Sequence, residues 1–303
     1  MARLRLADLD LSVGKRTRLH RLLYEHGPAN GTLLLLPVDQ GLEHGPVDFL
    51  TNPPAGDPEF QLKLALEGGY SGIVFQVGLA QKYLRDYAGR VPLLLKINGK
   101  TNIPPDDDPV SPLTAGVEDA VRLGADAIGY TLYVGSPRQD DDFVQFLEVR
   151  AEAERYGMPV VVWSYPRGAA VEAQGGQTSL WVVEYAARAA NELGADVVKL
   201  NLPKCGPGRT KTPQGYAEVE WDNNSDEAVA QIVRRVVDCA GRTMVLFSGG
   251  SKLGDEDLLT KAHACMAGGA TGLIFGRNMW QRPWSEALAM SAQLREVMAQ
   301  HGV

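Results

Sequence analysis

Eight short apolar segments recur along the chain, and amphipathic helical patterns lie between most of them. The apolar segments are rich in Val, Ile and Leu, and each has the length of a strand buried on both faces. They span residues 32–38, 72–76, 92–97, 127–133, 159–165, 196–202, 243–248 and 272–276. The helical patterns span residues 59–67, 116–123, 142–156, 179–193, 226–240, 255–267 and 283–300. This alternation predicts parallel strands joined by right-handed crossovers.

The number of strand segments favours an α/β fold of the (β/α)8 barrel type. Residues 32–303 are then one catalytic domain, and residues 1–31 form an N-terminal extension with a helix over 16–26. This extension closes the bottom of the barrel or packs on a neighbouring subunit. A doubly wound open sheet is the alternative, but no GxGxxG motif follows the first strand.

Glycine marks four of the connections that lead from a helix into the next strand. The connections are Gly68-Gly69, Gly124, Gly194 and Gly268-Gly269. Glycine at the end of a helix supplies the left-handed residue that caps it, so we expect each strand to begin directly after these glycines.

Composition narrows the class of function. The chain has 303 residues and a net charge of −7, which argues against a general nucleic-acid-binding surface. Its three cysteines form no CxxC pair, which predicts a reducing, cytoplasmic location rather than a disulfide framework. The N-terminus has no long apolar run and predicts neither a signal peptide nor a membrane span. The five histidines show no zinc-ligand spacing.

Lys199 lies in the sixth apolar segment, between valines and leucines. Burial lowers the pKa of a lysine, and the neutral amine is a nucleophile that forms Schiff bases with carbonyl groups. The structural alternative is a lysine at a strand end whose ammonium reaches water. The other strand ends favour the nucleophile.

The seventh and eighth segments end in residues that predict a phosphate site. Ser248-Gly249-Gly250 exposes backbone N–H groups, and Gly276-Arg277 adds a close-approach backbone and a guanidinium. Loops after the last two strands of a barrel commonly bind phosphate. A Gly-Gly pair alone is equally compatible with a simple turn.

Three more polar residues lie at or just after the ends of strand segments. They could supply the proton transfers and the anion binding that Schiff-base chemistry needs. Tyr165 is the candidate acid/base, provided that a nearby cation lowers the pKa of its hydroxyl. Asp39 either ionises the lysine and carries protons or caps the next helix. Arg167 either clamps a second anion with its planar fork or pairs with an acidic neighbour.

Two further residues are expected around the site. Two long loops, residues 98–113 and 203–225, also follow strand segments. Lys96 either balances Asp39 or forms a structural ion pair, and Trp163 is expected to wall the pocket. The run at 106–108 is interpreted as a solvated loop tip rather than a metal site. The other long loop, residues 203–225, carries Lys204, Arg209 and Lys211.

These motifs resemble the archaeal-type class I fructose-1,6-bisphosphate aldolases, which are Schiff-base enzymes. The resemblance rests on residues 38–46, 95–101, 129–133, 162–168, 194–199, 248–250 and 276–282. It implies that Lys199 is the Schiff-base lysine, that Tyr165 transfers protons and that Asp39 is a catalytic carboxylate. It also implies that Ser248, Gly249, Gly250, Gly276 and Arg277 bind the phosphate of the dihydroxyacetone-phosphate half, and it carries over Arg167 to the substrate. Trp163 and Lys96, from the strand ends themselves, are also expected among the substrate-site residues. The 203–225 loop is longer than in compact members.

The expected activity is therefore metal-independent, reversible cleavage of fructose 1,6-bisphosphate to dihydroxyacetone phosphate and glyceraldehyde 3-phosphate, in glycolysis or gluconeogenesis. The resemblance implies no cofactor and a cytoplasmic homo-oligomer, often a decamer, whose partner is a sugar phosphate and neither nucleic acid nor membrane. Related barrels offer the alternative: a transaldolase-like synthase of the aminodideoxyheptulosonate type, or a phospho-dione thiolase. A non-catalytic sugar-phosphate-binding protein and a class II metal aldolase are disfavoured.

Overall fold

The computed structural model describes residues 3–205, 213, 215–216, 219–249 and 253–303. Gly250 of the predicted phosphate site, and Arg209 and Lys211 of the long loop, lie outside the described residues.

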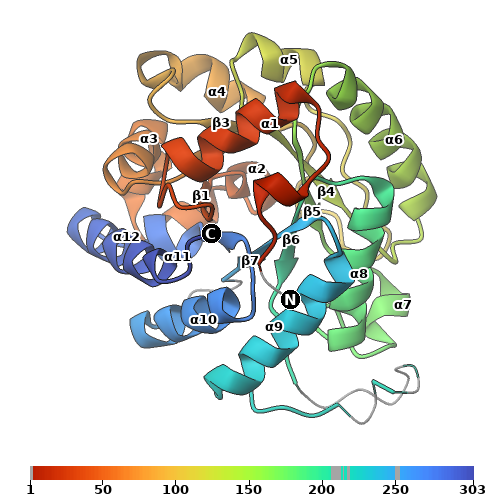
Figure 1. The fold of residues 1–303 in the computed structure, drawn as a ribbon. Coiled ribbons are helices and arrows are strands. Elements are labelled where there is room, and N and C mark those ends of the chain that lie inside the picture. Colours follow the sequence, from red (N-terminus) through yellow and green to blue (C-terminus); the bar gives the residue numbers. More distant parts are fainter. Residues whose placement is uncertain (1–2, 206–212, 214, 217–218, 250–252) are drawn as a thin grey trace.

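The eight predicted strands are all present, and they close into one parallel barrel in sequence order, β1 to β8 (Figure 1). Their bounds are β1 (Leu33–Pro37), β2 (Gly72–Gln76), β3 (Leu93–Lys96), β4 (Ala127–Leu132), β5 (Val160–Ser164), β6 (Val197–Asn201), β7 (Met244–Ser248) and β8 (Gly272–Ile274). The predicted (β/α)8 barrel is confirmed, and the open sheet is excluded because β1 pairs with β8.

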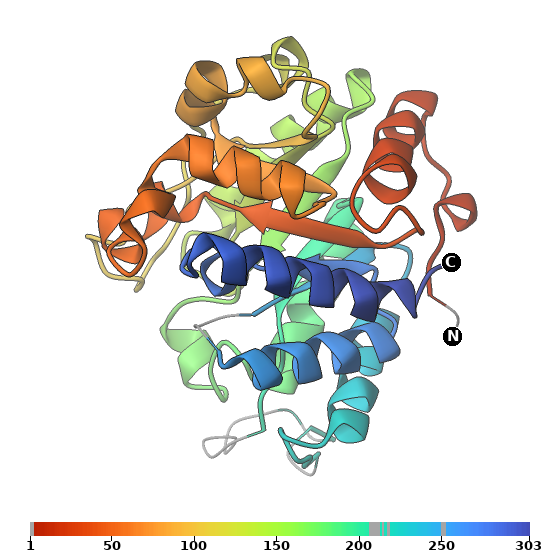
Figure 2. The same cartoon turned by 90° about the vertical axis from the view of Figure 1, so that its left-hand side faces the viewer.

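The long helices pack around the outside of the barrel (Figures 1 and 2). They are α3 (Pro58–Glu67), α4 (Val77–Tyr83), α5 (Val117–Arg122), α6 (Gln139–Arg155), α8 (Leu180–Leu193), α9 (Asp226–Ala240), α10 (Asp255–Ala267) and α12 (Trp284–Ala299). Short elements lie in the connections: α2 (Gln40–Glu43), α7 (Ala169–Glu172), α11 (Arg277–Trp280), η3 (Pro46–Phe49), η4 (Pro53–Gly56) and η5 (Arg85–Tyr87). The sequence prediction missed α4, which starts directly after β2 without a side-chain cap. None of the described helices is long and apolar enough to cross a bilayer.

The N-terminal segment covers the end of the barrel where the strands begin. It comprises η1 (Leu6–Asp8), α1 (Val13–His20) and the π-helical turn η2 (Arg21–Glu25). The expected helix over 16–26 therefore starts earlier, because the Ser12 hydroxyl caps it. Leu19, Leu22 and Leu23 pack against the inward-facing residues that open the strands, among them Leu33, Val197 and Met244.

Side chains alternate between the inside and the outside of the barrel along each strand. On β6, Val197 belongs to the inner cluster, whereas Val198 and Leu200 pack in the outer layer against the helices. Because the period is two, Lys199 returns to the inside at the end where the strands terminate. The same alternation places Lys96 and Trp163 inside the barrel.

The glycine connections behave as predicted. Gly69, Gly124, Gly194 and Gly269 have φ of 67°, 67°, 92° and 96°, in the left-handed region. Each strand begins within three residues of its glycine, so the sequence sets the entry point of β2, β4, β6 and β8.

Candidate active site

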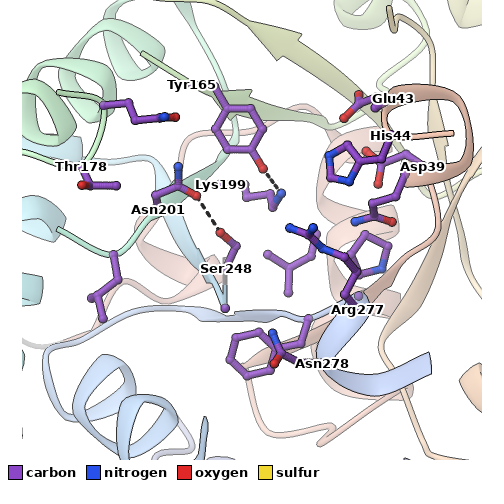
Figure 3. Close-up of a pocket in the computed structure, with 18 of the residues that line it drawn as sticks. Asp39, Glu43, His44, Tyr165, Thr178, Lys199, Asn201, Ser248, Arg277 and Asn278 are labelled. Atoms are coloured by element: carbon purple, nitrogen blue, oxygen red, sulfur yellow. Dashed lines mark hydrogen bonds between the residues drawn. The ribbon is translucent and has the colours of Figure 1, made fainter. Parts of the chain in front are cut away.

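A cavity of about 550 Å³ opens at the carboxyl ends of the strands (Figure 3). The predicted site residues that line it are Asp39, Tyr165, Arg167, Lys199, Ser248, Gly249, Gly276 and Arg277. Lys96 and Trp163 are buried and are not among the residues that line it, so the expectation that Trp163 walls the pocket is corrected. The barrel thus brings predicted site residues from five strand ends into one space.

Lys199 lies at the centre of the cavity and is only 5% exposed. Its Nζ donates a hydrogen bond to the Tyr165 hydroxyl and lies 5.4 Å from the centre of the Trp163 ring. Burial lowers the pKa of Lys199 to about 8, although Asp39 and Glu43 favour the charged form. The predicted desolvation of this amine is therefore confirmed, and a substantial fraction is neutral near pH 8.

Tyr165 follows β5, one strand from Lys199, and points at its amine (Figure 3). Burial raises the pKa of Tyr165 well above its ordinary value, and the negative charges of Glu43 and Asp39 add to that effect. The Arg167 guanidinium, 5.2 Å above the ring, lowers the pKa of Tyr165 but is outweighed. The sequence-based expectation of a lowered pKa is wrong, because burial dominates the nearby cation.

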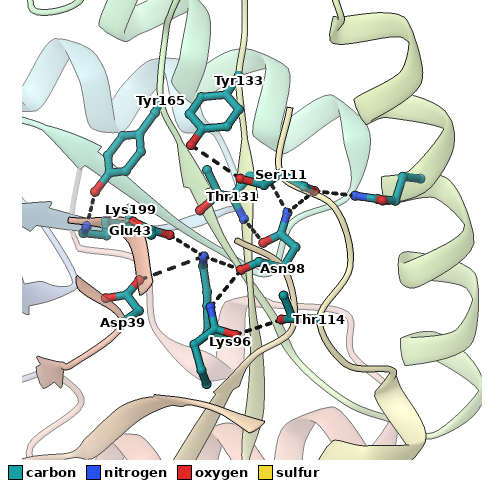
Figure 4. A network of polar contacts seen from close by, with 12 residues as sticks. Asp39, Glu43, Lys96, Asn98, Ser111, Thr114, Thr131, Tyr133, Tyr165 and Lys199 are labelled. Carbon is teal, nitrogen blue, oxygen red and sulfur yellow. Dashed lines mark hydrogen bonds and ion pairs between the residues drawn. The ribbon is translucent and has the colours of Figure 1, made fainter. Parts of the chain in front are cut away.

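Asp39 is buried in the cavity wall beside the short helix α2 (Figure 4). It occupies the N-cap position of that helix, but its side chain makes no capping hydrogen bond. Neither carboxylate oxygen has a hydrogen-bond partner among the described residues. Burial and the charge of Glu43 raise the pKa of Asp39, while Lys96 and Lys199 lower it. The capping interpretation is thereby excluded.

Glu43 is a residue of the site that the sequence interpretation did not select. Its carboxylate accepts a hydrogen bond from Lys96 Nζ at 3.0 Å, whereas Asp39 Oδ2 lies 3.9 Å from the same nitrogen. It is four residues from Asp39, which places both carboxylates on one side of α2. That spacing directly after a strand was the available signal.

Lys96 is held in place by the backbone of β3 and its neighbours (Figure 4). Its Nζ donates to the Asn98 carbonyl at 2.9 Å, and the Asn98 side chain bridges to both backbone groups of Thr131 at 2.7 and 2.8 Å. A fully buried ammonium with fixed acceptors is a structural charge, and it lowers the pKa of Lys199 by repulsion.

The predicted phosphate end of the cavity follows β7 and β8. Ser248 Oγ donates to Asn201 Oδ1 at 3.0 Å. A Cβ on Gly249 would come within 2.6 Å of the Asn278 amide nitrogen, and one on Gly276 within 2.8 Å of the Pro37 carbonyl oxygen. Gly276 therefore leaves no room for a side chain, because the Pro37 backbone is fixed, and a side chain at Gly249 would displace Asn278. Their bare backbones and Arg277 line the same part of the cavity.

Arg167 and Lys100 also line the cavity, where they follow β5 and β3. Asp106 joins them: Lys100 Nζ lies 2.6 Å from Oδ1, and Arg167 Nε lies 3.4 Å from Oδ2. Asp106 is therefore an ion-pair partner within the cavity rather than only a solvated loop residue. Of the two interpretations of Arg167, an acidic neighbour is the one present in this structure.

Two described residues of the long loop after β6 are tied to the barrel. Lys204 donates its backbone N–H to the Thr178 carbonyl at 2.9 Å and lines the cavity. The Tyr216 hydroxyl donates to Glu184 on α8, which also accepts from Arg235 on α9 at 2.9 Å.

No described group of three or more His, Cys, Asp or Glu side chains is placed to hold a metal ion. His44, the histidine nearest a strand end, lies with Nδ1 2.7 Å from Asp48.

Several known proteins are similar to this chain in sequence and in structure. The family model of the DeoC/LacD family aldolases matches residues 33–282. A class 1 fructose-bisphosphate aldolase of Thermoproteus tenax is 40% identical over 269 residues, covering 88% of this chain and 90% of the relative. One from Halobacterium salinarum is 37% identical over 261 residues, covering 86% and 89%. An archaeal fructose-1,6-bisphosphate aldolase, solved with its catalytic lysine bound to the carbinolamine intermediate, superimposes with a TM-score of 0.77 at 37% identity, covering 93% and 99%.

Proposed function

The chain belongs to the DeoC/LacD family of aldolases, and we infer that it is a class I, Schiff-base fructose-bisphosphate aldolase. It reversibly cleaves fructose 1,6-bisphosphate to dihydroxyacetone phosphate and glyceraldehyde 3-phosphate. The observation that carries this inference is the buried Lys199 amine, with its lowered pKa, beside Tyr165 and between two cationic ends of one cavity.

Lys199 starts the reaction. Its neutral amine attacks the C2 ketone and forms a carbinolamine. The phosphate on C1 lies against Ser248, Gly249 and Arg277, which sets C2 next to the amine. Gly250 and Gly276 belong to this phosphate end in the same proposal.

Tyr165 carries the proton that the next two steps exchange. Its phenol protonates the departing hydroxyl of the carbinolamine, so that water leaves and a cationic imine forms beside the phenolate. The high pKa of Tyr165 makes that phenolate a strong base. It then takes the proton of the C4 hydroxyl while the C3–C4 bond breaks, and the bond electrons move into the imine to give an enamine.

Asp39 is the second proton carrier in this proposal. It lines the cavity, its pKa is raised, and its charge favours the ammonium form of Lys199. Lys96 and Trp163 lie beneath the reacting atoms and act by positioning Asp39 and Lys199. Arg167 is assigned to the second phosphate of the substrate.

The catalysis is proposed to need no metal, since the imine itself is the electron sink. Trapping tests this directly: the protein is incubated with fructose 1,6-bisphosphate and EDTA, reduced with borohydride and mapped by peptide mass. A three-carbon phosphate adduct on Lys199 is the expected result. The absence of this adduct in folded protein contradicts the proposal and favours another phospho-sugar substrate or a role in binding alone.

We also propose that the enzyme is a cytoplasmic homo-oligomer, a decamer by the family resemblance. Val121 on α5 and Val144 and Leu147 on α6 are exposed apolar residues on two helices that contact one another. Such a face is typical of a subunit contact. Light scattering of the wild type and of Leu147→Glu tests it: the variant is expected to dissociate, and an unchanged mass contradicts this face.

A further inference from the structure

Two groups of positive charge lie at different ends of the cavity, on either side of Lys199. Arg277 follows β8, next to Ser248 at the end of β7. Lys100 and Arg167 follow β3 and β5. In Figure 3 Tyr165 and Ser248 lie on opposite sides of the Lys199 amine, as their strands do around β6. The arrangement suits a substrate with one phosphate at each end.

The second group already holds an anion supplied by the chain. Asp106 presents one carboxylate oxygen to each cation, at 2.6 Å from Lys100 Nζ and 3.4 Å from Arg167 Nε. The three residues all line the cavity. Phosphate oxygens bridge an ammonium and a guanidinium in the same way. The Asp106 side chain is 50% exposed, whereas those of Lys100 and Arg167 are 18% and 21% exposed. The anion is therefore the member of the group most open to exchange.

We propose that Asp106 is an internal competitor for the second phosphate of the substrate. Its carboxylate occupies the Lys100 and Arg167 pair in the free enzyme and is displaced when a bisphosphate binds. The inference rests on the proposed aldolase function, and it makes Asp106 a residue that sets the preference between bisphosphate and monophosphate sugars.

The position of Arg167 explains why this exchange reaches the reacting atoms. Arg167 lies 5.2 Å over the ring of Tyr165, whose hydroxyl accepts the hydrogen bond from Lys199. A phosphate on Arg167 therefore lies one side chain from the acid/base. Asp106 competes for that place, whereas a sugar phosphate held only at Ser248 and Arg277 leaves the Asp106 contacts untouched.

The experiment compares Asp106→Asn with Asp107→Asn, which removes the same charge from the neighbouring residue of the loop. Both are assayed with fructose 1,6-bisphosphate and with fructose 1-phosphate. Because partly exposed ion pairs are weak, Asp106→Asn is expected to lower KM for the bisphosphate by roughly three- to fivefold. The kcat/KM of Asp106→Asn for the monophosphate is expected to stay within about twofold of wild type. The kcat/KM of Asp107→Asn is expected to stay within the same range for both substrates.

The sign of the change decides between the possible roles of Asp106. A raised KM for the bisphosphate would mean that Asp106 positions the two cations, and an unchanged KM would mean a solvated loop residue; either result overturns the proposal. Lys100→Met supplies a second test. It is expected to raise KM for the bisphosphate and to reduce the effect of Asp106→Asn in the double variant, and fully additive effects contradict competition at this pair.

Trapping of dihydroxyacetone phosphate separates this inference from the proposed function. An adduct on Lys199 in the wild type together with equal behaviour of the two asparagine variants leaves the aldolase and rejects the competitor. No adduct in the wild type rejects both, because the competitor is defined by the aldolase substrate.

Discussion

Glu43 holds the ammonium of Lys96 at 3.0 Å, closer than the 3.9 Å that separates Lys96 from the buried Asp39. Lys96 therefore hydrogen-bonds to Glu43, whereas its distance to Asp39 is too long for a hydrogen bond. Asp39 keeps two oxygens without hydrogen-bond donors among the described residues, and its pKa rises. Burial is the largest cause of the raised pKa of Asp39, and the charge of Glu43 adds to it.

Glu43→Gln is expected to shift the pH dependence of adduct formation to lower pH. The neutral Lys199 amine reacts, so the rate of trapping with dihydroxyacetone phosphate in the wild type rises with pH through a midpoint near 8. The charge of Glu43 raises the pKa of Lys199, so its removal lowers the midpoint. Glu256→Gln, on the exposed first turn of α10, is the control. A midpoint that stays or moves upward contradicts the prediction.

Lys199→Ala is expected to abolish cleavage, with a loss of at least about 10⁴-fold in kcat, because no other amine replaces the nucleophile. Its fold, followed by circular dichroism, and its binding of dihydroxyacetone phosphate, followed by calorimetry, are expected to change little. Full activity in this variant would contradict the assignment of Lys199.

Tyr165→Phe is expected to slow both steps that exchange the Tyr165 proton. Cleavage of fructose 1,6-bisphosphate falls by about 10²–10⁴-fold, since the proton acceptor for the C4 hydroxyl is lost. Dihydroxyacetone phosphate still gives an adduct on the intact Lys199, but the adduct is trapped more slowly than in the wild type, because loss of water from the carbinolamine also uses the Tyr165 proton. Cleavage at the wild-type rate would assign the proton transfer to Asp39 instead.

Lys15→Met is expected to destabilise the protein by about 3–5 kcal/mol, measured by urea unfolding, because it leaves a buried carboxylate without its cation. Lys15 is buried and lies 3.0 Å from Asp196, whose carboxylate also accepts the Val160 N–H at 2.8 Å. Burial raises the pKa of Asp196 and Lys15 lowers it. At low pH Asp196 is protonated in both proteins, so the loss is smaller there and grows as the pH rises.

Two further variants test the origin of that loss. Adding Asp196→Asn to Lys15→Met is expected to recover part of the stability, because no uncompensated buried charge remains and Glu154, the other partner of Lys15, is exposed to water. Lys63→Met breaks the exposed pair of Lys63 with Glu59 and is expected to change stability by less than about 1 kcal/mol. Equal losses from Lys15→Met and Lys63→Met contradict the buried-pair explanation.

The barrel could be predicted from the sequence because the two patterns that indicate it, apolar runs and glycines at helix ends, are local. The apolar runs identify the strands, and the glycines at 124 and 194 identify where strands begin. Residues two apart on a strand face the same side, so Lys199 points into the barrel like Val197. The position of the proposed nucleophile therefore follows from its place on the strand. Helix α4 was missed because it starts at Val77 directly after β2, without a capping side chain or loop signal.

The electrostatics of the site could not be read in the same way. Whether the pKa of Tyr165 is raised or lowered depends on how deeply its hydroxyl is buried. An arginine two residues away in the sequence gives no information about that burial. The contacts of Asp106 with Lys100 and Arg167, and of Glu43 with Lys96, depend on how loops from different strands fold over one another. Only tertiary structure supplies those distances.

The leucines of the N-terminal segment have a consequence for the order of events in catalysis. Leu19, Leu22 and Leu23 pack on the inner residues at the end of the barrel where the strands begin, opposite the cavity. In the proposed mechanism both products therefore leave through the cavity mouth at the other end. The three-carbon half is still bound to Lys199 after cleavage, so the aldehyde departs first and, in the reverse direction, arrives last.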